Sequence, residues 1–208
     1  MNRKEFISKS VKASIAMGLS NSALASVGKN REGLTVLYTN DWHSRIDPFP
    51  MDGGRYQGLG GAAKRAALIS KIRKERLNVL LLDSGDIFQG TPYFNHFGGE
   101  LEFKLMSKMG YDAITLGNHD FDAGLNGLKK QLVHAKFDIL CGNYNFDQTI
   151  LKDEFDSYRI FNKGKYRVGV FGIGIELNGL VPKKSFGKTI YSDPIIKANE
   201  IAAILRLK

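Results

Sequence analysis

The sequence has very little cysteine and no long apolar run. Its one cysteine, Cys141, cannot form an intramolecular disulfide, so cysteine usage leaves the compartment undetermined. Cys141 lies in an apolar, strand-like stretch, where a buried and inert thiol is the preferred interpretation. No stretch approaches the ~20 apolar residues that a membrane-spanning helix requires, so no stable membrane span is expected. Internal repeats and low-complexity segments are also absent from the sequence.

Acidic residues are outnumbered, with 21 against 30 lysines and arginines, and the formal net charge is +9 at pH 7. A basic surface can bind nucleic acid, but here the basic residues are scattered over the expected helices and no nucleic-acid-binding motif accompanies them. Solvated helix faces are the preferred interpretation, and no nucleic-acid partner is expected. A basic module for anionic polymers stays as a lesser alternative, which salt-dependent binding without metal dependence would favour. The length of 208 residues, with 43% apolar and 25% charged, fits one globular core.

The N-terminal segment predicts export. Residues 1–12 are basic, residues 13–19 are modestly apolar, and Ala23-Leu24-Ala25 fits a small-x-small cleavage pattern. Arg3-Lys4-Glu5-Phe6-Ile7 resembles the twin-arginine export signature with lysine in place of the second arginine, so the twin-arginine and Sec routes both stay open. We predict an export signal in residues 1–25 and a periplasmic location. The alternative is an amphipathic or disordered leader on a cytosolic protein.

Strand-like and helix-like segments alternate along the rest of the chain. Their apolar spacing predicts strands at residues 34–38, 79–82, 113–116, 137–141, 159–165 and 166–173, with a tight turn between the last two. It predicts helices at residues 62–76, 101–109 and 125–135, and one that begins at Ser192-Asp193-Pro194 and continues to the end of the sequence. This alternation indicates βαβ units and a largely parallel sheet in an α/β fold.

Three polar clusters directly follow three of the expected strands. Asp41-Trp42-His43 follows the first strand, Asp83-Ser84-Gly85-Asp86 follows the second, and Gly117–Asp122 follows the third. Because successive strand ends of βαβ units emerge along one edge of a sheet, we expect the three clusters to converge there. Each cluster taken alone could be a simple polar turn. Three such clusters in succession argue against that interpretation.

The residue types in these clusters suit a metal site. Asp41 and His43 place a carboxylate and an imidazole two residues apart, Asp86 adds a carboxylate able to bridge two ions, and Asn118 adds a neutral oxygen. Mixed Asp, His and Asn ligands suit Mn, Zn, Fe or similar divalent ions, and the absence of cysteine from these clusters argues against a soft site. Two bridged ions are the usual arrangement for activating water against a phosphate ester.

His119 and Asp122 lie beside this ligand set in the third cluster. An imidazole next to a metal ligand is well placed as a general acid or as a charge stabiliser on phosphate. The Asp122 carboxylate would fix the tautomer of that imidazole. We therefore expect His119 and Asp122 to be catalytic.

The three clusters closely resemble the first three motifs of the calcineurin-like metallophosphatases. The matching segments are Asp41-Trp42-His43, Gly85-Asp86-Ile87-Phe88-Gln89-Gly90-Thr91-Pro92-Tyr93 and Gly117-Asn118-His119-Asp120-Phe121-Asp122. The Gln-Gly-Thr-Pro extension and the final aspartate point to the 5′-nucleotidase branch, which also hydrolyses UDP-sugars and 2′,3′-cyclic nucleotides. The resemblance runs from about Leu34 to the last residue.

This resemblance implies a fold, a ligand set and a partner domain. The fold is an α/β/β/α sandwich of two packed mixed sheets. Asp41 and His43 would hold the first metal, Asp86 would bridge and Asn118 would hold the second. His119 would contact the scissile phosphate with Asp122 as its partner. Exported members of the family usually continue into a C-terminal domain that binds the nucleoside with aromatic side chains.

The histidines depart from the family pattern. The family draws further ligands from a His motif and a Gly-His-x-His motif that come later in its sequence, whereas this chain has four histidines in all, His43, His96, His119 and His134. We interpret His134 as a solvated helix residue and His96 as a loop residue near the site, with a substitute ligand as its alternative. We therefore expect residues 33–208 to be the N-terminal part of a metallophosphatase domain, incomplete at its C-terminus. Its second metal site would be incomplete and its substrate-binding domain missing.

The expected function is a metal-dependent phosphoesterase that hydrolyses nucleotide phosphate esters through water activated by two metal ions. The alternative is a truncated, catalytically inactive remnant that binds at most one metal ion or a nucleotide. The first predicts metal-dependent phosphate release that Asp86→Ala and His119→Ala abolish, and the second predicts binding without turnover. The sequence leaves the metal, the phosphate ester and the oligomeric state open.

Overall fold

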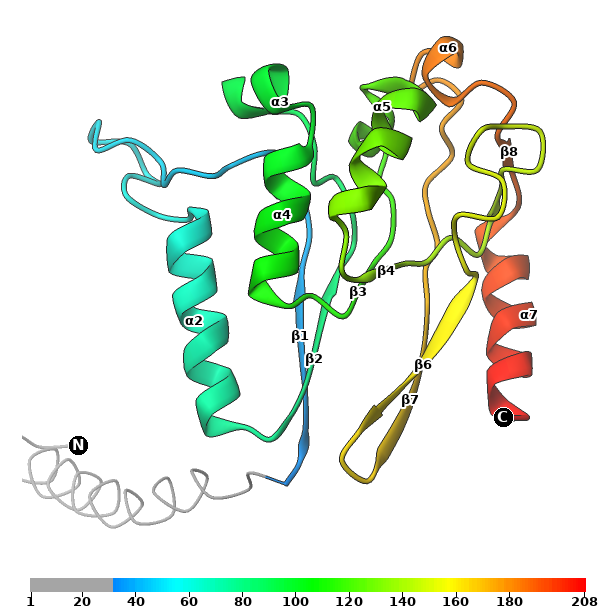
Figure 1. Cartoon of the computed structure of the whole chain (residues 1–208), viewed down its shortest axis with the longest axis horizontal. Helices are drawn as coiled ribbons and strands as arrows, with labels where there is room; N and C mark the ends of the chain where they lie inside the picture. Colours follow the sequence, from blue (N-terminus) through cyan, green and yellow to red (C-terminus); the bar gives the residue numbers. More distant parts are fainter. Residues whose placement is uncertain (1–31) are drawn as a thin grey trace, which may run out of the picture.

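A computed structural model describes residues 32–208, so the expected export signal at residues 1–25 lies outside the described residues. The elements in chain order are shown in Figure 1. They are β1 (Leu34–Thr39), α2 (Ala62–Glu75), β2 (Asn78–Asp83), α3 (Pro92–Phe97), α4 (Glu100–Met109), β3 (Ala113–Ile114), the 3₁₀ helix η2 (His119–Phe121), α5 (Gly124–Gln131), the 3₁₀ helix η3 (Leu132–His134), β4 (Asp138–Ile139), β5 (Tyr144–Asn145), β6 (Tyr158–Lys163), β7 (Tyr166–Phe171), α6 (Lys183–Phe186), β8 (Ile190–Tyr191) and α7 (Pro194–Arg206).

The central sheet is parallel throughout, in the order β1-β2-β3-β4, which confirms the α/β prediction. Strand β2 is the best buried, because its continuous apolar run is covered on both faces. Strands β3 and β4 have only two residues each, shorter than predicted. The chain leaves the regular ladder after Ile114, although Thr115 N–H still bonds to Asp83 O at 3.0 Å. The segment that carries the third cluster is thus a loop close to the sheet.

Helices α2, α4 and α5 lie on one side of this sheet (Figure 1). Leu81 and Ile114 of the sheet belong to the same buried cluster as Phe103 and Met106 of α4 and Leu128 of α5. Among residues 32–208 no helix is both long and apolar enough to cross a membrane. The core therefore sits between the helices and the sheet and leaves one edge of the sheet to the loops.

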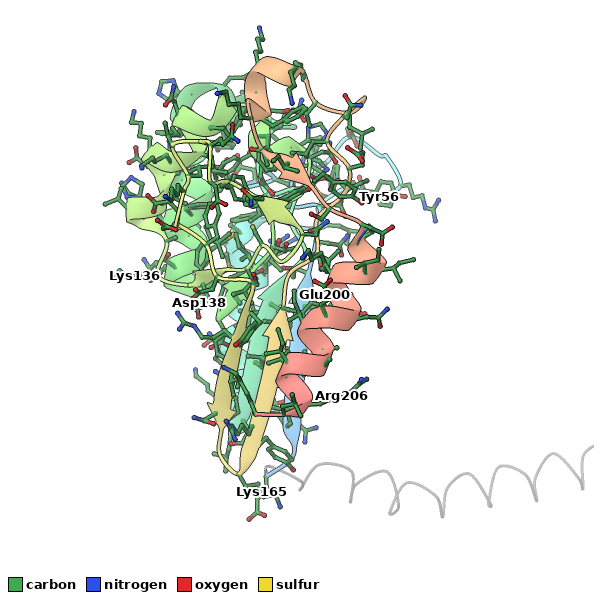
Figure 2. The ribbon with its side chains drawn as sticks, turned by 90° about the vertical axis from the view of Figure 1, so that its right-hand side faces the viewer. Tyr56, Lys136, Asp138, Lys165, Glu200 and Arg206 are labelled. Carbon is green, nitrogen blue, oxygen red and sulfur yellow. The ribbon has the colours of Figure 1, made fainter. Side chains whose placement is uncertain are left out.

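A β-hairpin crosses the opposite edge of the parallel sheet. β6 and β7 pair antiparallel, as the sequence predicts, and Lys165 lies at their turn (Figure 2). Arg159 bonds to Asp138 at the start of β4, and Lys163 bonds to Asp112 just ahead of β3. The hairpin thus runs along the amino ends of the strands. In the described part of the chain, the antiparallel strands form two separate pairs, β6-β7 and β5-β8, rather than one second mixed sheet.

Several predicted helix boundaries were wrong. His96 was expected to lie in a loop but lies in helix α3, where Pro92 at the first position follows an extended Thr91, a start signal for a helix. Helix α5 stops at Gln131, and the rest of the predicted helix continues as η3. Helix α7 ends at Arg206 instead of continuing to Lys208, because the final turn tightens: Leu207 N–H bonds to Ile204 O at 3.2 Å.

Candidate metal centre

The loops that follow β1 and β2 are joined by backbone hydrogen bonds. Three N–H groups of the first loop donate to carbonyls of the second, Asp41 to Gly85 at 3.0 Å, His43 to Asp86 at 3.0 Å and Ser44 to Ile87 at 2.9 Å. Asp41, His43 and Asp86 also have left-handed backbone angles, with φ of 51°, 48° and 56°. Such angles cost energy in residues with a side chain and persist where the surroundings fix them, commonly at functional sites. The two loops are thereby bent toward each other.

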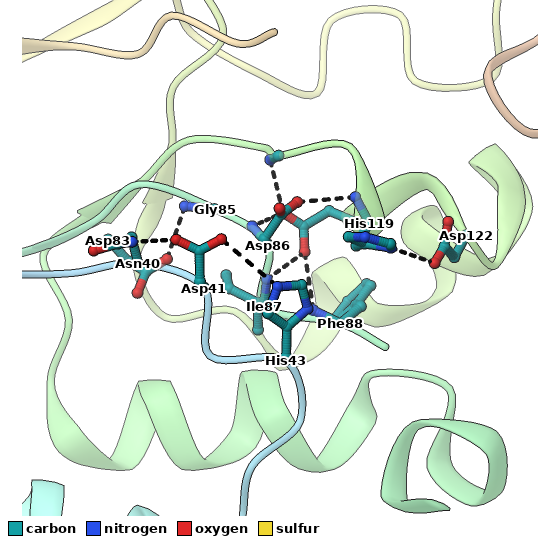
Figure 3. Close-up of polar contacts among 12 residues, drawn as sticks. Asn40, Asp41, His43, Asp83, Gly85, Asp86, Ile87, Phe88, His119 and Asp122 are labelled. Atoms are coloured by element: carbon teal, nitrogen blue, oxygen red, sulfur yellow. Dashed lines mark hydrogen bonds and ion pairs between the residues drawn. The ribbon is translucent and has the colours of Figure 1, made fainter. Parts of the chain in front are cut away.

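The side chains of Asp41, His43 and Asp86 meet at one point. Their ligand atoms all lie within 4.8 Å of one another, and His43 Nε2 is 3.6 Å from Asp41 Oδ1. Figure 3 shows the three side chains gathered at the ends of the strands. Two carboxylates and an imidazole at this spacing are a suitable donor set for a divalent ion of the borderline or hard class. The residues present therefore fit a metal ion at this point.

The third cluster joins the same site. His119 N–H donates to Asp86 Oδ1 at 2.9 Å, and the rings of His43 and His119 lie edge to face with centroids 5.1 Å apart. The predicted convergence of the three clusters is therefore confirmed. Asn118 is half-buried in this loop, and within residues 32–208 its side chain makes no hydrogen bond, so its amide oxygen is free for a ligand.

His119 is oriented by Asp122. His119 Nδ1 lies 2.8 Å from Asp122 Oδ2, which fixes Nδ1 as the bonded nitrogen and leaves Nε2 for a ligand (Figure 3). Burial lowers the pKa of His119, but the hydrogen bond and charge of Asp122, together with Asp86 and Asp120, outweigh burial and raise the pKa above its usual value. His119 thus keeps its proton at a higher pH than a free imidazole does.

Asp120 is a residue of the site for which the sequence predicted no role. Its side chain is fully buried, and its carboxylate accepts four backbone N–H groups, from Asp86 at 3.0 Å, Ile87 at 2.9 Å, Phe88 at 3.2 Å and Gly117 at 2.8 Å. Burial raises the pKa of Asp120 to about 7, against the lowering effect of these bonds. Four donors aimed at one carboxyl group favour its charged form. Asp120 therefore fastens the loop that carries Asp86 to the third cluster.

A second buried carboxylate, Asp83, holds the strand ends below the site. Asp83 accepts the N–H of Gly85 at 2.9 Å and the hydroxyl of Thr39, whose oxygen lies 2.7 Å from the Tyr111 hydroxyl. Burial raises the pKa of Asp83 to about 6, opposed by the bonds from Thr39 and Gly85. Thr39 lies two residues before Asp41, so Asp83 links the strand ends that carry the first two clusters. In the sequence, the one signal for this role of Asp83 is its position at the end of an apolar run.

The two remaining histidines lie apart from the ligand group. His96 lies on α3, with its ring 4.7 Å from that of Phe97, and His134 lies in η3. In the part of the chain that the structure describes, the group able to hold a metal contains neither of them. Cys141 is free and buried, as expected, and burial raises the pKa of its thiol.

Comparisons with known proteins agree with this geometry. Residues 34–196 match the family described as calcineurin-like phosphoesterase. Snake venom 5′-nucleotidase of Gloydius brevicauda is 41% identical over 157 residues, which are 72% of this chain and 27% of that protein. The 5′-nucleotidase of Vibrio parahaemolyticus is 36% identical over 208 residues, 98% of this chain and 36% of that protein.

Solved structures of nucleotidases are also similar to this chain. The 5′-nucleotidase precursor from Thermus thermophilus matches with a TM-score of 0.74 and 32% identity, over 84% of this chain and 34% of that one. The NAD nucleotidase of Haemophilus influenzae matches with a TM-score of 0.75 and 33% identity, over 84% of this chain and 32% of that one. The chain thus spans between 27% and 36% of the length of these four relatives.

Proposed function

We propose that this chain, which belongs to the calcineurin-like phosphoesterase family, is a metal-dependent phosphoesterase that hydrolyses nucleotide phosphate esters. One observation carries the proposal: the ligand atoms of Asp41, His43 and Asp86 lie within 4.8 Å of one another, beside the His119–Asp122 pair. A metal-ligand group next to an oriented imidazole is the combination that phosphate ester hydrolysis needs. The 5′-nucleotidases among the relatives support a nucleotide as the substrate.

We assign Asp41, His43 and Asp86 to the first metal ion, and Asp86 with Asn118 to a second. Divalent ions such as Mn²⁺, Zn²⁺ or Fe²⁺, when bound, supply Lewis acidity and lower the pKa of water. The bond from His119 N–H to Asp86 Oδ1 leaves the other oxygen of Asp86 free for a ligand. The free amide oxygen of Asn118 supports the second assignment.

We assign His119 to the scissile phosphate. Asp122 holds Nδ1, so Nε2 is the nitrogen that donates to a phosphate oxygen or to the leaving oxygen. In hydrolysis the oxygen of water forms the new bond to phosphorus, and the bond to the ester oxygen breaks. The ester oxygen leaves with the proton of His119, which water then replaces. The raised pKa of His119 supports this role because it favours the protonated form, which donates the proton.

A second candidate function is metal or nucleotide binding without turnover. It is favoured by the ligand group itself, which within residues 32–208 consists of three side chains and includes neither His96 nor His134. Tight Mn²⁺ binding with no phosphate release from any nucleotide would support it against hydrolysis.

Export to the periplasm remains a separate proposal. It rests on the basic start, the apolar stretch and the small-x-small pattern within residues 1–25. Fractionation of cells that make the chain tests it, because an exported protein is recovered in the periplasm with a mass reduced by loss of this segment. Retention of the full mass in the cytoplasm would contradict it.

Phosphate release from adenosine 5′-monophosphate tests the proposed function directly. We expect the 208-residue chain to release phosphate with Mn²⁺ and not with EDTA, and His119→Asn to lower the rate about 100-fold or more. Asp86→Asn should lower both the rate and the affinity for Mn²⁺. His134→Asn is the matched control, since it removes an imidazole outside the site. Equal rates for the two histidine variants would contradict the assignment.

A further inference from the structure

Trp42 lies in the chain between two proposed metal ligands, Asp41 and His43, and its side chain is buried in the core. The turn around it is strained, because Asp41, His43 and Ser44 have left-handed backbone angles, with φ of 51°, 48° and 51°. Such a turn keeps its shape only where the surrounding contacts fix it. The Trp42 indole supplies one contact, since its Nε1–H donates to Arg45 O at 2.8 Å. Trp42 therefore fixes the ligand-bearing turn to the core.

The side chain of Arg65, on helix α2, lies against the Trp42 ring. Its guanidinium carbon is 4.6 Å from the centre of that ring. An arginine over an indole is a favourable cation–π pair, and the attraction grows where water is excluded. In the part of the chain from residue 32 onward, Arg65 Nη1 is buried and makes no hydrogen bond. At that atom no hydrogen bond competes with the ring contact, so the stack on Trp42 determines where this end of the guanidinium lies.

The charge of Arg65 also acts on the carboxylates below the site. Burial raises the pKa of Asp83, the charge of Arg65 lowers it, and the charge of Asp41 raises it again. Arg65 thus offsets the repulsion between Asp83 and the ligand Asp41.

Helix α2 is joined to the same loop at its start. Ala62 N–H donates to Ile46 O at 2.8 Å, and Arg65 lies about one turn further along the helix. Ala62 and Trp42 belong to one buried cluster, on the helical side of the sheet (Figure 1). Because a packed helix holds a side chain more precisely than a loop does, Arg65 contacts Trp42 from a rigid support.

We propose that Arg65 is a positioning residue of the metal centre, which holds Trp42 in place and thereby keeps Asp41 and His43 aimed at one ion. The inference rests on the proposed function, since it takes Asp41 and His43 as metal ligands. A guanidinium has no acceptor atom and cannot itself bind a metal ion. Its effect on metal affinity therefore passes through the shape of the turn.

Calorimetric titration with Mn²⁺ tests this role in variants of two arginines of α2. Arg65→Met removes the charge and the planar group at similar length, and we expect it to weaken Mn²⁺ binding about tenfold, as the loss of groups that orient metal ligands does. Arg65→Lys keeps a cation over the ring and should recover part of the loss. Arg73→Met is the matched control, because the Arg73 guanidinium donates to Met109 O and Gly110 O, away from the ligand group. We expect it to lower the melting temperature in EDTA but not the Mn²⁺ affinity.

A double-mutant cycle shows whether Arg65 acts through the indole. Trp42→Leu should weaken Mn²⁺ binding, and Arg65→Met added to it should weaken binding no further. If Trp42→Leu does not fold, acrylamide quenching of Trp42, the one tryptophan of the chain, decides instead. Stronger quenching in Arg65→Met than in the wild-type protein and Arg73→Met supports the inference, and equal quenching in the three proteins overturns it.

The titration separates failure of this inference from failure of the proposed function. Wild-type Mn²⁺ binding with equal affinity in Arg65→Met, an equal loss in Arg65→Met and Arg73→Met, or additive losses in the cycle overturn the positioning role alone. Wild-type Mn²⁺ binding without phosphate release, with the tenfold loss confined to Arg65→Met, overturns hydrolysis and supports the positioning role. Absence of Mn²⁺ binding by the wild-type protein overturns both.

Discussion

At the scale of single residues, the site depends on a side chain that is not expected to touch metal or substrate. The Asp120 carboxylate accepts four backbone N–H groups from the two loops that carry Asp86 and His119. Each charged hydrogen bond of this kind contributes about 1.5–3 kcal/mol, and its loss in a buried place leaves a donor unsatisfied. Asp120 therefore determines where the Asp86 carboxylate lies.

Asp120→Asn tests this role of the carboxylate. The amide keeps one acceptor oxygen and presents an NH₂ group to N–H groups that formerly had an acceptor. We expect the free energy of unfolding to fall by about 3 kcal/mol, measured by urea denaturation in EDTA. Asp52→Asn is the matched control, since Asp52 is exposed and accepts a single N–H, from Gly54. A loss in Asp120→Asn no larger than in this control would show that the four bonds contribute little.

At the scale of elements, the predictions succeeded where one local signal dominated. The apolar run of β2 and the helical spacing of α2 were sufficient, and Asp193 before Pro194 marked the start of α7. The predictions failed where the end of an element depends on tertiary contacts. Strand β3 is shorter than predicted because the chain after Ile114 turns into the loop that carries the third cluster. The polar residues of the site were found from their spacing, but the pairing of Asp120 with the Asp86 loop was not. That pairing includes the N–H of Asp86, whose left-handed backbone angle no local pattern indicates.

The N-cap of α7 gives a prediction at this scale. The Asp193 carboxylate accepts the N–H groups of Ile195 and Ile196, each at 2.9 Å. We expect Asp193→Ala to lower the free energy of unfolding by about 1 kcal/mol, the usual contribution of such a cap. Asp193→Asn retains an acceptor oxygen and should lose much less, so thermal unfolding of both variants is the measurement. Equal losses would mean that the charge, and not the hydrogen bonds, stabilises the helix start.

At the scale of the whole molecule, the two ends of the parallel sheet differ in role: the hairpin covers the amino ends of the strands, and the candidate site lies at their carboxyl ends. The hairpin of β6 and β7 crosses the amino ends of the strands, where Lys163 and Asp112 pair. The loops at the carboxyl ends bring Asp41, Asp86 and His119 together from three separate stretches of sequence. Topology made this convergence predictable, since consecutive βαβ units place successive strand ends on one edge.

Because the ligands come from separate loops, metal binding should stabilise the whole fold. A ligand that binds only the folded state adds RT ln(1 + [L]/Kd), about 2.7 kcal/mol at a hundredfold excess over Kd. We expect Mn²⁺ to raise the melting temperature of the chain and EDTA to reverse the rise. Asp41→Asn should abolish most of the effect, whereas Asp47→Asn, a nearby acid outside the ligand group, should keep it. A rise of equal size in both variants would place the stabilising metal elsewhere and contradict the ligand assignment on which the proposed hydrolysis rests.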